Sequence, residues 1–237
     1  MDSASSQGKN GTRGALYVDG FNLYHPIHET GLNYLKWACL WTLGEILCRP
    51  EGLHLVKVVF CTAMPKHLPD SFMRHITYNN AQIARNVEVL KGHHVPTGDS
   101  YSEKQSDINV ALSLICDGED DIYDAAFLLS ADSDQVATGK FFKQRFAPKG
   151  KRLFAAIPPN QTYPPDYKGL DVPRRNISVH MMECCVMDEQ VKGQKGFIPR
   201  PPEYAPPEGW VHPRDRSKGK PPKAPKKAAW SKPTKAR

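Results

Sequence analysis

Short apolar runs alternate along the chain with stretches in which apolar residues recur every three or four positions. The runs predict strands, because a strand covered on both faces is apolar throughout, and the repeats predict amphipathic helices. Strands are expected at 15–18, 55–61, 87–90, 125–130, 152–157 and 177–181. Helices are expected within 35–47 and at 70–85, 103–116 and 134–146.

This alternation predicts an α/β fold, a three-layer sandwich around a mainly parallel central sheet. In such sheets ligands bind at the carboxyl ends of the strands, near the point where the strand order reverses. Acidic residues that directly follow an apolar strand are therefore the first candidates for a functional site.

The positive charge lies at the end of the chain. The net charge is +7 over 237 residues, and residues 198–237 hold eleven Lys or Arg, three Asp or Glu, and 10 of the 21 prolines. A segment with so few aliphatic residues buries too little surface to offset its ordering entropy, which predicts a disordered, basic, Pro-rich tail. The expected organisation is a flexible N-terminus at 1–14, one domain at 15–187 and the tail at 188–237.

Composition excludes several classes of protein. No run approaches the 18 apolar residues of a membrane span, and residues 1–14 lack the apolar core of a secretory signal, so a cytoplasmic protein with no membrane partner is expected. The six cysteines show no C-x-x-C spacing, which disfavours zinc and disulfides. The phosphate-binding G-x-x-x-x-G-K-S/T motif is also absent, which argues against an NTPase.

The first candidate is Asp19, which directly follows the strand expected at 15–18. Its neighbours Gly20 and Asn22 leave a plain structural interpretation open, since Asp-Gly favours a tight turn and Asn22 could cap the next helix. A second pair, Asp132 and Asp134, follows the strand expected at 125–130. A helix cap at Ser133 or Asp134 explains one of these two acids but not both, and two carboxylates so close repel each other unless a cation or proton separates them.

The third candidate is Asp107. Ser102 and Gln105 have the spacing of a capping box, which predicts a helix that begins near residue 103 and places Asp107 inside it. A helix capped by Ser106 is the alternative. The expected buried stripe of this helix is Ile108, Ala111, Leu112 and Ile115, with Asp107 beside it. Lys104, less than a turn away, could hold Asp107 ionised or contact a substrate phosphate.

These acids suit a hard cation. Asp19, Asp107 and Asp132, with Asp134, come from three distant segments and have no His or Cys companion, and carboxylates are the ligands that Mg²⁺ or Mn²⁺ prefers. A cation held there lowers the pKa of a bound water and stabilises the charge on a leaving oxygen. The sequence therefore predicts metal-assisted phosphodiester hydrolysis.

Three motifs also carry a family resemblance. The segments Tyr-Val-Asp-Gly-Phe-Asn at 17–22, Glu-Lys-Gln-Ser-Asp at 103–107 and Ser-Ala-Asp-Ser-Asp at 130–134 resemble the motifs of an NYN domain, a branch of the PIN-like nuclease superfamily. The resemblance covers about residues 15–181. It implies a parallel-sheet fold and a Mg²⁺-dependent ribonuclease site, with Asp19, Asn22, Asp107, Asp132 and Asp134 in its acidic and polar positions.

The sequence departs from that family pattern at two positions. Ala131 stands where Gly is usual, which is harmless unless the backbone there needs a positive φ, and Gln135 stands where Phe is common. Neither change removes an expected metal ligand. A ribonuclease is therefore the expected function, and a non-catalytic RNA-binding or adaptor protein on the same fold is the alternative. RNA is the expected partner, with the Pro-rich tail as a possible docking segment for a protein.

Overall fold

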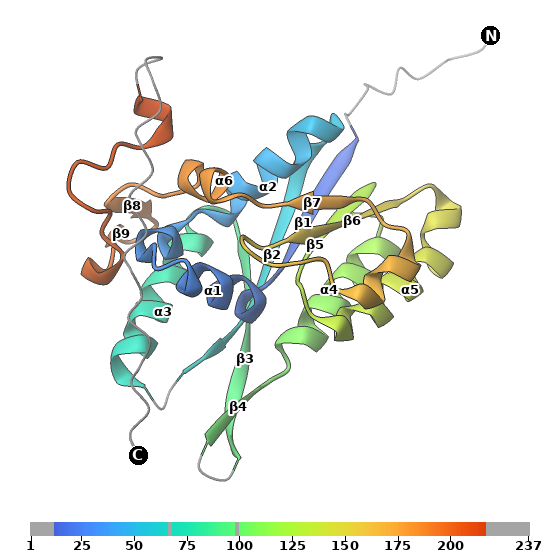
Figure 1. The fold of residues 1–237 in the computed structure, drawn as a ribbon, viewed down its shortest axis with the longest axis horizontal. Coiled ribbons are helices and arrows are strands. Elements are labelled where there is room, and N and C mark those ends of the chain that lie inside the picture. The colour runs from blue at the N-terminus through green and yellow to red at the C-terminus, as the bar shows by residue number, and fades with distance from the viewer. Residues whose placement is uncertain (1–11, 66–67, 98–99, 217–237) are drawn as a thin grey trace, which may run out of the picture.

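The computed structural model describes residues 12–65, 68–97 and 100–216 (Figure 1). In these ranges a seven-stranded sheet has the order β4-β3-β2-β1-β5-β6-β7. Every neighbouring pair is parallel except β3 and β4, which are antiparallel. Along the chain, β2, β3 and β4 follow one another on one side of β1, and β5, β6 and β7 then follow on its other side. The strand order therefore reverses between β1 and β5.

The strands are β1 (Arg13–Asp19), β2 (His54–Met64), β3 (Glu88–Thr97), β4 (Ser100–Lys104), β5 (Ala125–Leu129), β6 (Arg152–Ile157) and β7 (Arg174–Asn176), and a separate hairpin of β8 (Gln190–Gly193) and β9 (Gly196–Pro199). The helices are α1 (Gly20–Glu29), α2 (Leu40–Cys48), α3 (Pro69–Ile83), α4 (Ser106–Glu119), α5 (Val136–Arg145) and α6 (Val179–Cys184). Short 3₁₀ turns include η1 (Asn33–Trp37), η3 (Ser133–Gln135), η5 (Pro165–Leu170) and η6 (Pro202–Tyr204). No helix of the described ranges is both long and apolar enough to cross a membrane.

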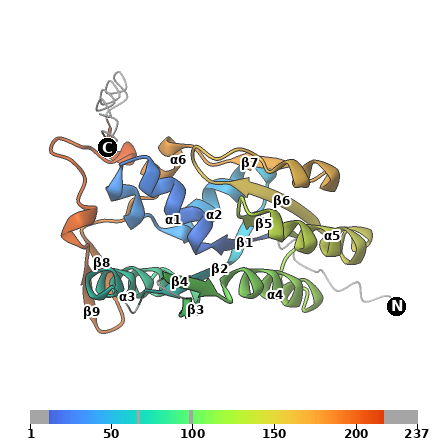
Figure 2. The same ribbon diagram turned by 60° about the horizontal axis from the view of Figure 1, so that its bottom comes forward.

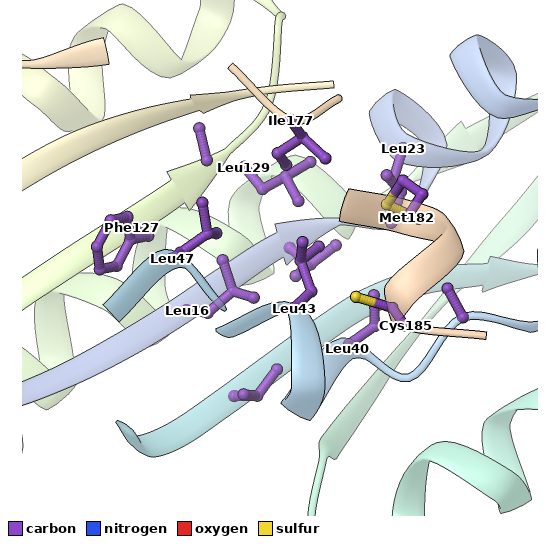
Figure 3. Close-up of a cluster of buried hydrophobic side chains, with 14 of the residues drawn as sticks. Leu16, Leu23, Leu40, Leu43, Leu47, Phe127, Leu129, Ile177, Met182 and Cys185 are labelled. Carbon is purple, nitrogen blue, oxygen red and sulfur yellow. The ribbon is translucent and has the colours of Figure 1, made fainter. Parts of the chain in front are cut away.

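Helices cover both faces of the sheet, as the apolar strands require. On one face Leu16 and Phe127 pack against α1, α2 and α6, in the buried cluster of Figure 3. On the other face Tyr17 and Leu128 pack against α4 and α5. Figure 2 shows α1 and α2 on the opposite side of the molecule from α4. The expected α/β architecture with a mainly parallel central sheet is confirmed.

The strand expected at 177–181 is wrong. β7 ends at Asn176, and the side chain of Ser178 accepts a hydrogen bond from the Met181 amide at 3.1 Å, which caps α6. The apolar positions here serve a helix, because Met182 and Cys185 reach the core with helical spacing. The helix expected within 35–47 is likewise divided: extended backbone at Ala38 and Cys39 separates η1 from α2.

The expected helix start at residue 103 is also wrong. Residues 100–104 form β4, so the capping box does not form and α4 begins at Ser106 after Gln105, whose φ is 79°. The buried face of α4 contains Val110 and Leu114, while Ile108 and Leu112 are exposed. The expected stripe was therefore two positions out of phase, because several apolar residues on this helix face solvent.

The expected disorder from residue 188 is contradicted as far as Arg216. β8 and β9 form an antiparallel hairpin, and Val191 and Tyr204 are buried with Trp37 and Ala81. The ring of Trp210 lies 5.4 Å from that of Tyr34. Burial of a few large side chains stabilises this segment despite its prolines. Residues 217–237 of the expected tail, and 1–11 of the expected flexible N-terminus, lie outside the described residues.

Candidate functional site

Asp19 ends β1 and begins the site. Its carboxylate is fully buried and accepts hydrogen bonds from the Phe21 and Asn22 amides at 3.1 and 3.2 Å, from Asn22 Nδ2 at 2.7 Å and from Ser130 Oγ at 3.2 Å. Asp19 is thus the N-cap of α1, a position where a negative charge is favoured by the helix dipole. The expected tight turn and the cap at Asn22 are both wrong, because α1 begins at Gly20, Asp19 is its cap and Asn22 lies inside the helix.

Gly20 allows α1 to start directly against the sheet. A Cβ at this position would lie 2.7 Å from the Cys61 carbonyl oxygen and 2.9 Å from the Phe60 ring. The backbone of α1 therefore approaches β2 more closely than any side chain permits. This close contact fixes both the cap at Asp19 and the direction of the first turn of α1.

A chain of hydrogen bonds connects the ends of β1 and β5. Ser130 follows β5 and is buried; its hydroxyl donates to Asp19 Oδ2 and accepts from the Asp132 amide at 3.1 Å. Asp132 Oδ1 in turn accepts from the Asp134 amide at 2.9 Å, so Asp132 caps the short turn η3. Ala131 lies in this loop without a positive φ, so its side chain causes no backbone strain.

The side chain of Gln135 connects this loop to the start of α4 through a hydrogen bond. Its side chain is buried, donates to the Asp107 carbonyl oxygen at 3.0 Å, and accepts from the Thr138 hydroxyl at 2.9 Å. A Phe in this position could make neither hydrogen bond. The departure from the family pattern at Gln135 therefore has a defined structural role, which is to hold Asp107 beside the end of β5.

The electrostatics of Asp107 show that the acids lie close together. Partial burial, the negative charges of Asp19 and Asp132, a hydrogen bond with Asp19 and the charge of Asp134 raise the pKa of Asp107 to about 6. Burial and nearby negative charge both disfavour the ionised carboxylate. The fold thus places Asp19, Asp132 and Asp134 within electrostatic range of Asp107, near the edge where the strand order reverses.

The donor chemistry of this site fits a hard divalent cation. All four acidic groups are carboxylates, and partial burial together with the negative charge of the other acids raises the pKa of Asp107. In the part of the chain that the structure describes, no three His, Cys, Asp or Glu side chains already stand close enough to hold a metal.

Comparisons with known proteins identify a structural neighbour. No protein-family model matches the sequence, and no curated protein matches it. A crystal structure of a protein of unknown function from Vibrio parahaemolyticus matches with a TM-score of 0.50 at 17% sequence identity. The match covers 73% of this chain and 96% of that chain. At this identity the match supports the fold and carries no information about activity.

Sequence analysis missed two buried hydroxyls near the acids. Ser106 Oγ and Tyr167 Oη are buried and have no hydrogen-bond partner among the described residues. Burial raises the pKa of Tyr167, and the charges of Asp132 and Asp19 add to this effect, which places the phenol within electrostatic range of the site. No motif points to Tyr167, because it follows the acids by more than thirty positions and reaches them only through the fold of η5.

The structure places the remaining residues that the sequence singled out as follows. Asn22 contacts Asp19 as described above, and it orients that carboxylate. Lys104 belongs to β4, but its side chain lies outside what the structure describes. The six cysteines are free in the structure. Asp134 is exposed at the rim of the site.

Proposed function

We propose that this protein is a metal-dependent ribonuclease of the NYN and PIN-like type, which hydrolyses RNA phosphodiester bonds at a Mg²⁺ or Mn²⁺ site. One observation carries the proposal: Asp19, Asp107 and Asp132 come from distant segments and lie within electrostatic range of one another at the carboxyl edge of the sheet, where its strand order reverses. Open α/β sheets bind their ligands at that position.

Each residue has a role in this proposal. Asp19, Asp107 and Asp132 hold the cation, and Asp134 adds negative charge at the rim. Asn22 keeps the Asp19 carboxylate in place through its side-chain amide, and Lys104 contacts a substrate phosphate. When bound, the cation supplies an activated water and stabilises charge on the leaving oxygen.

The alternative is an RNA-binding or adaptor protein in which the acids only support the fold. The hydrogen bonds of Asp19 suit that alternative, because a helix cap is a structural role. Asp107 does not suit it, since a carboxylate whose pKa is raised by burial and by neighbouring acids destabilises the folded state when it is ionised. Perturbed carboxylates of this kind are typical of functional sites, which favours the enzyme.

The test is cleavage of a mixed panel of labelled RNA and DNA oligonucleotides with Mg²⁺, with Mn²⁺ and with EDTA. Asp132→Asn is the informative variant, because an amide oxygen can still accept the hydrogen bond from the Asp134 amide while the charge is lost. RNA cleavage that needs the cation and falls by orders of magnitude in Asp132→Asn supports the proposal. Asp120→Asn, an exposed acid at the far end of α4, is the matched control.

Near-wild-type cleavage by purified Asp132→Asn would overturn the proposed site. RNA binding without cleavage under any cation would instead favour the adaptor protein.

A further inference from the structure

A pocket of about 260 Å³ opens between α1 and α3, next to the acidic site. Its floor is apolar and is formed by Leu23, Ile27, Leu35, Phe60 and Met182. Figure 3 shows Leu23 and Met182 together in the core beneath it. The volume lies just below the roughly 300–1,000 Å³ of typical ligand pockets, so the pocket suits one small, flat group.

Aromatic rings form the two walls. On the α1 side the rings of Phe21 and His25 lie 4.1 Å apart, and Phe21 is 51% exposed, so its face is available to a ligand. On the α3 side His75 lies 6.1 Å from Tyr24, ring centre to ring centre, and Tyr78 also lines the pocket. Flat ligands that stack on rings are favoured by such walls, and every nucleobase has a face that can stack.

None of the described residues that line the pocket is acidic, and Lys36 brings one positive charge to it. Burial lowers the pKa of His25, so this imidazole is neutral at neutral pH and adds no charge. The Lys36 ammonium lies 3.0 Å from His28 Nδ1 and 4.6 Å above the centre of the Tyr24 ring, so it is held at the rim. Thr62 and Ser71 add hydroxyl groups to the lining. An aromatic ligand that carries a negative charge complements this lining, and a cationic ligand does not.

The pocket adjoins the acidic site through residues that neighbour Asp19. Gly20 and Phe21, which line it, directly follow Asp19 in sequence. On the neighbouring strand Thr62, which also lines it, directly follows Cys61, the residue paired with Asp19 in the register of β1 and β2. A strand of nucleic acid whose phosphate lies at the carboxylates therefore has a base within reach of the pocket.

We propose that this pocket binds one unpaired nucleobase of the RNA substrate, with its phosphate toward Lys36, and so selects the nucleotide beside the cleaved bond. The identity of the ligand as part of an RNA substrate rests on the proposed ribonuclease function. Binding of a nucleotide between α1 and α3 does not depend on catalysis and can be tested separately. An extruded base also requires single-stranded RNA, so paired RNA is excluded from this pocket.

The experiment measures binding of the four nucleoside 3′-monophosphates to the full chain by calorimetry, in EDTA, so that no cation contributes. Ribose 5-phosphate serves as the probe that lacks a base. We expect at least one nucleotide to bind about tenfold or more tightly than ribose 5-phosphate. Phe21→Ala and His75→Ala, one from each wall, should each weaken binding of that nucleotide by about tenfold.

Matched controls separate the pocket from other effects. Phe141→Ala removes a ring of α5 that is 46% exposed, comparable to Phe21, and should leave nucleotide affinity unchanged. Lys36→Gln should weaken binding of the nucleotide while leaving that of the corresponding nucleoside unchanged. Asp132→Asn should not weaken nucleotide binding, because it acts on the acidic site alone. Thermal melting of each variant confirms that the folded state is retained.

The outcomes distinguish the two proposals. Nucleotide binding that is lost in both wall variants, in a chain that cleaves no RNA, supports the pocket and overturns the nuclease. Cation-dependent cleavage in a chain whose nucleotide affinity equals that for ribose 5-phosphate overturns the pocket and leaves the nuclease standing. Tight nucleotide binding that neither wall variant alters also overturns the pocket, because the nucleotide then binds elsewhere.

Discussion

The hydroxyl of Ser130 donates a hydrogen bond to the buried carboxylate of Asp19 across 111 positions of sequence, at 3.2 Å. The contact joins the ends of β1 and β5 at the point where the strand order reverses. Since the same hydroxyl accepts from the Asp132 amide, one side chain sets the relative position of two of the acids.

Replacing Ser130 should therefore disturb both stability and the site. Ser130→Ala removes a donor from a buried carboxylate and an acceptor from a partly buried amide, and we expect a loss of about 1–3 kcal/mol in the free energy of unfolding. RNA cleavage should fall as well. Urea denaturation measures the first effect, with Ser113→Ala on α4 as the control, and equal stability of the two variants would show that the hydrogen bond contributes little.

Replacing Gly20 by a larger residue should destabilise the folded state for steric reasons. In Gly20→Ala the added methyl meets the Cys61 carbonyl at 2.7 Å, so α1 has to move away from β2, at a cost of about 1–3 kcal/mol in the free energy of unfolding. Gly169→Ala is the control, because a Cβ there has no neighbour within 4 Å. Thermal or urea unfolding of both variants tests this, and a Gly20→Ala variant as stable as Gly169→Ala contradicts it.

Divalent cations should stabilise the folded chain. A ligand that binds only the folded state raises its stability by mass action, and here it also relieves repulsion among carboxylates. We expect Mg²⁺ or Mn²⁺ to raise Tm. The rise should vanish in the double variant Asp107→Asn, Asp132→Asn and persist in Asp120→Asn; the same rise in the double variant would place the bound cation elsewhere.

Asp124, at the end of the sheet opposite the acidic site, should make the stability of the folded chain depend on pH. Its hydrogen bonds with Arg13 lower the pKa of Asp124 to about 2. A lowered carboxyl pKa stabilises the folded state above the unfolded pKa of about 3.9, and that contribution is lost as the pH falls through about 2. Asp124→Asn should therefore be less stable than wild type at pH 6, with the difference shrinking between about pH 4 and 2. A difference that is constant with pH would contradict this assignment.

The end of the chain should add RNA affinity that is independent of sequence. Residues 217–237 carry eight Lys or Arg and no Asp or Glu. If five phosphates of a single strand are contacted, deletion after Arg216 should flatten the slope of log K against log salt by about 3.5 units. Single-turnover cleavage at saturating enzyme should stay nearly the same. Equal affinity and slope for the two chains would instead favour a protein partner for this segment.

A deletion after Phe197 should behave differently. It also removes Tyr204 and Trp210, which pack against the domain, so it should lower Tm as well as RNA affinity. Only the deletion after Arg216 isolates the charge effect.

The sequence by itself determined the architecture and the identity of the candidate acids. Strands with both faces covered are apolar runs, so the pattern of apolar residues along the chain predicted β1, β2, β5 and β6. For β6 the predicted bounds match the observed ones, Arg152–Ile157. Parallel strands point their carboxyl ends to one edge, so Asp19 and Asp132 could be expected together before any coordinates.

Only the tertiary structure decided which face of α4 is buried, and it placed Ile108 in solvent and Val110 in the core. It also decided that the chain beyond residue 188 folds, through burial of Val191 and Tyr204 against Trp37. The tertiary structure also decided the hydrogen bond from Gln135 to Asp107, the position of Tyr167 near the acids, and the pocket between α1 and α3. All of these depend on contacts between residues far apart in sequence, and local periodicity carries no information about such contacts.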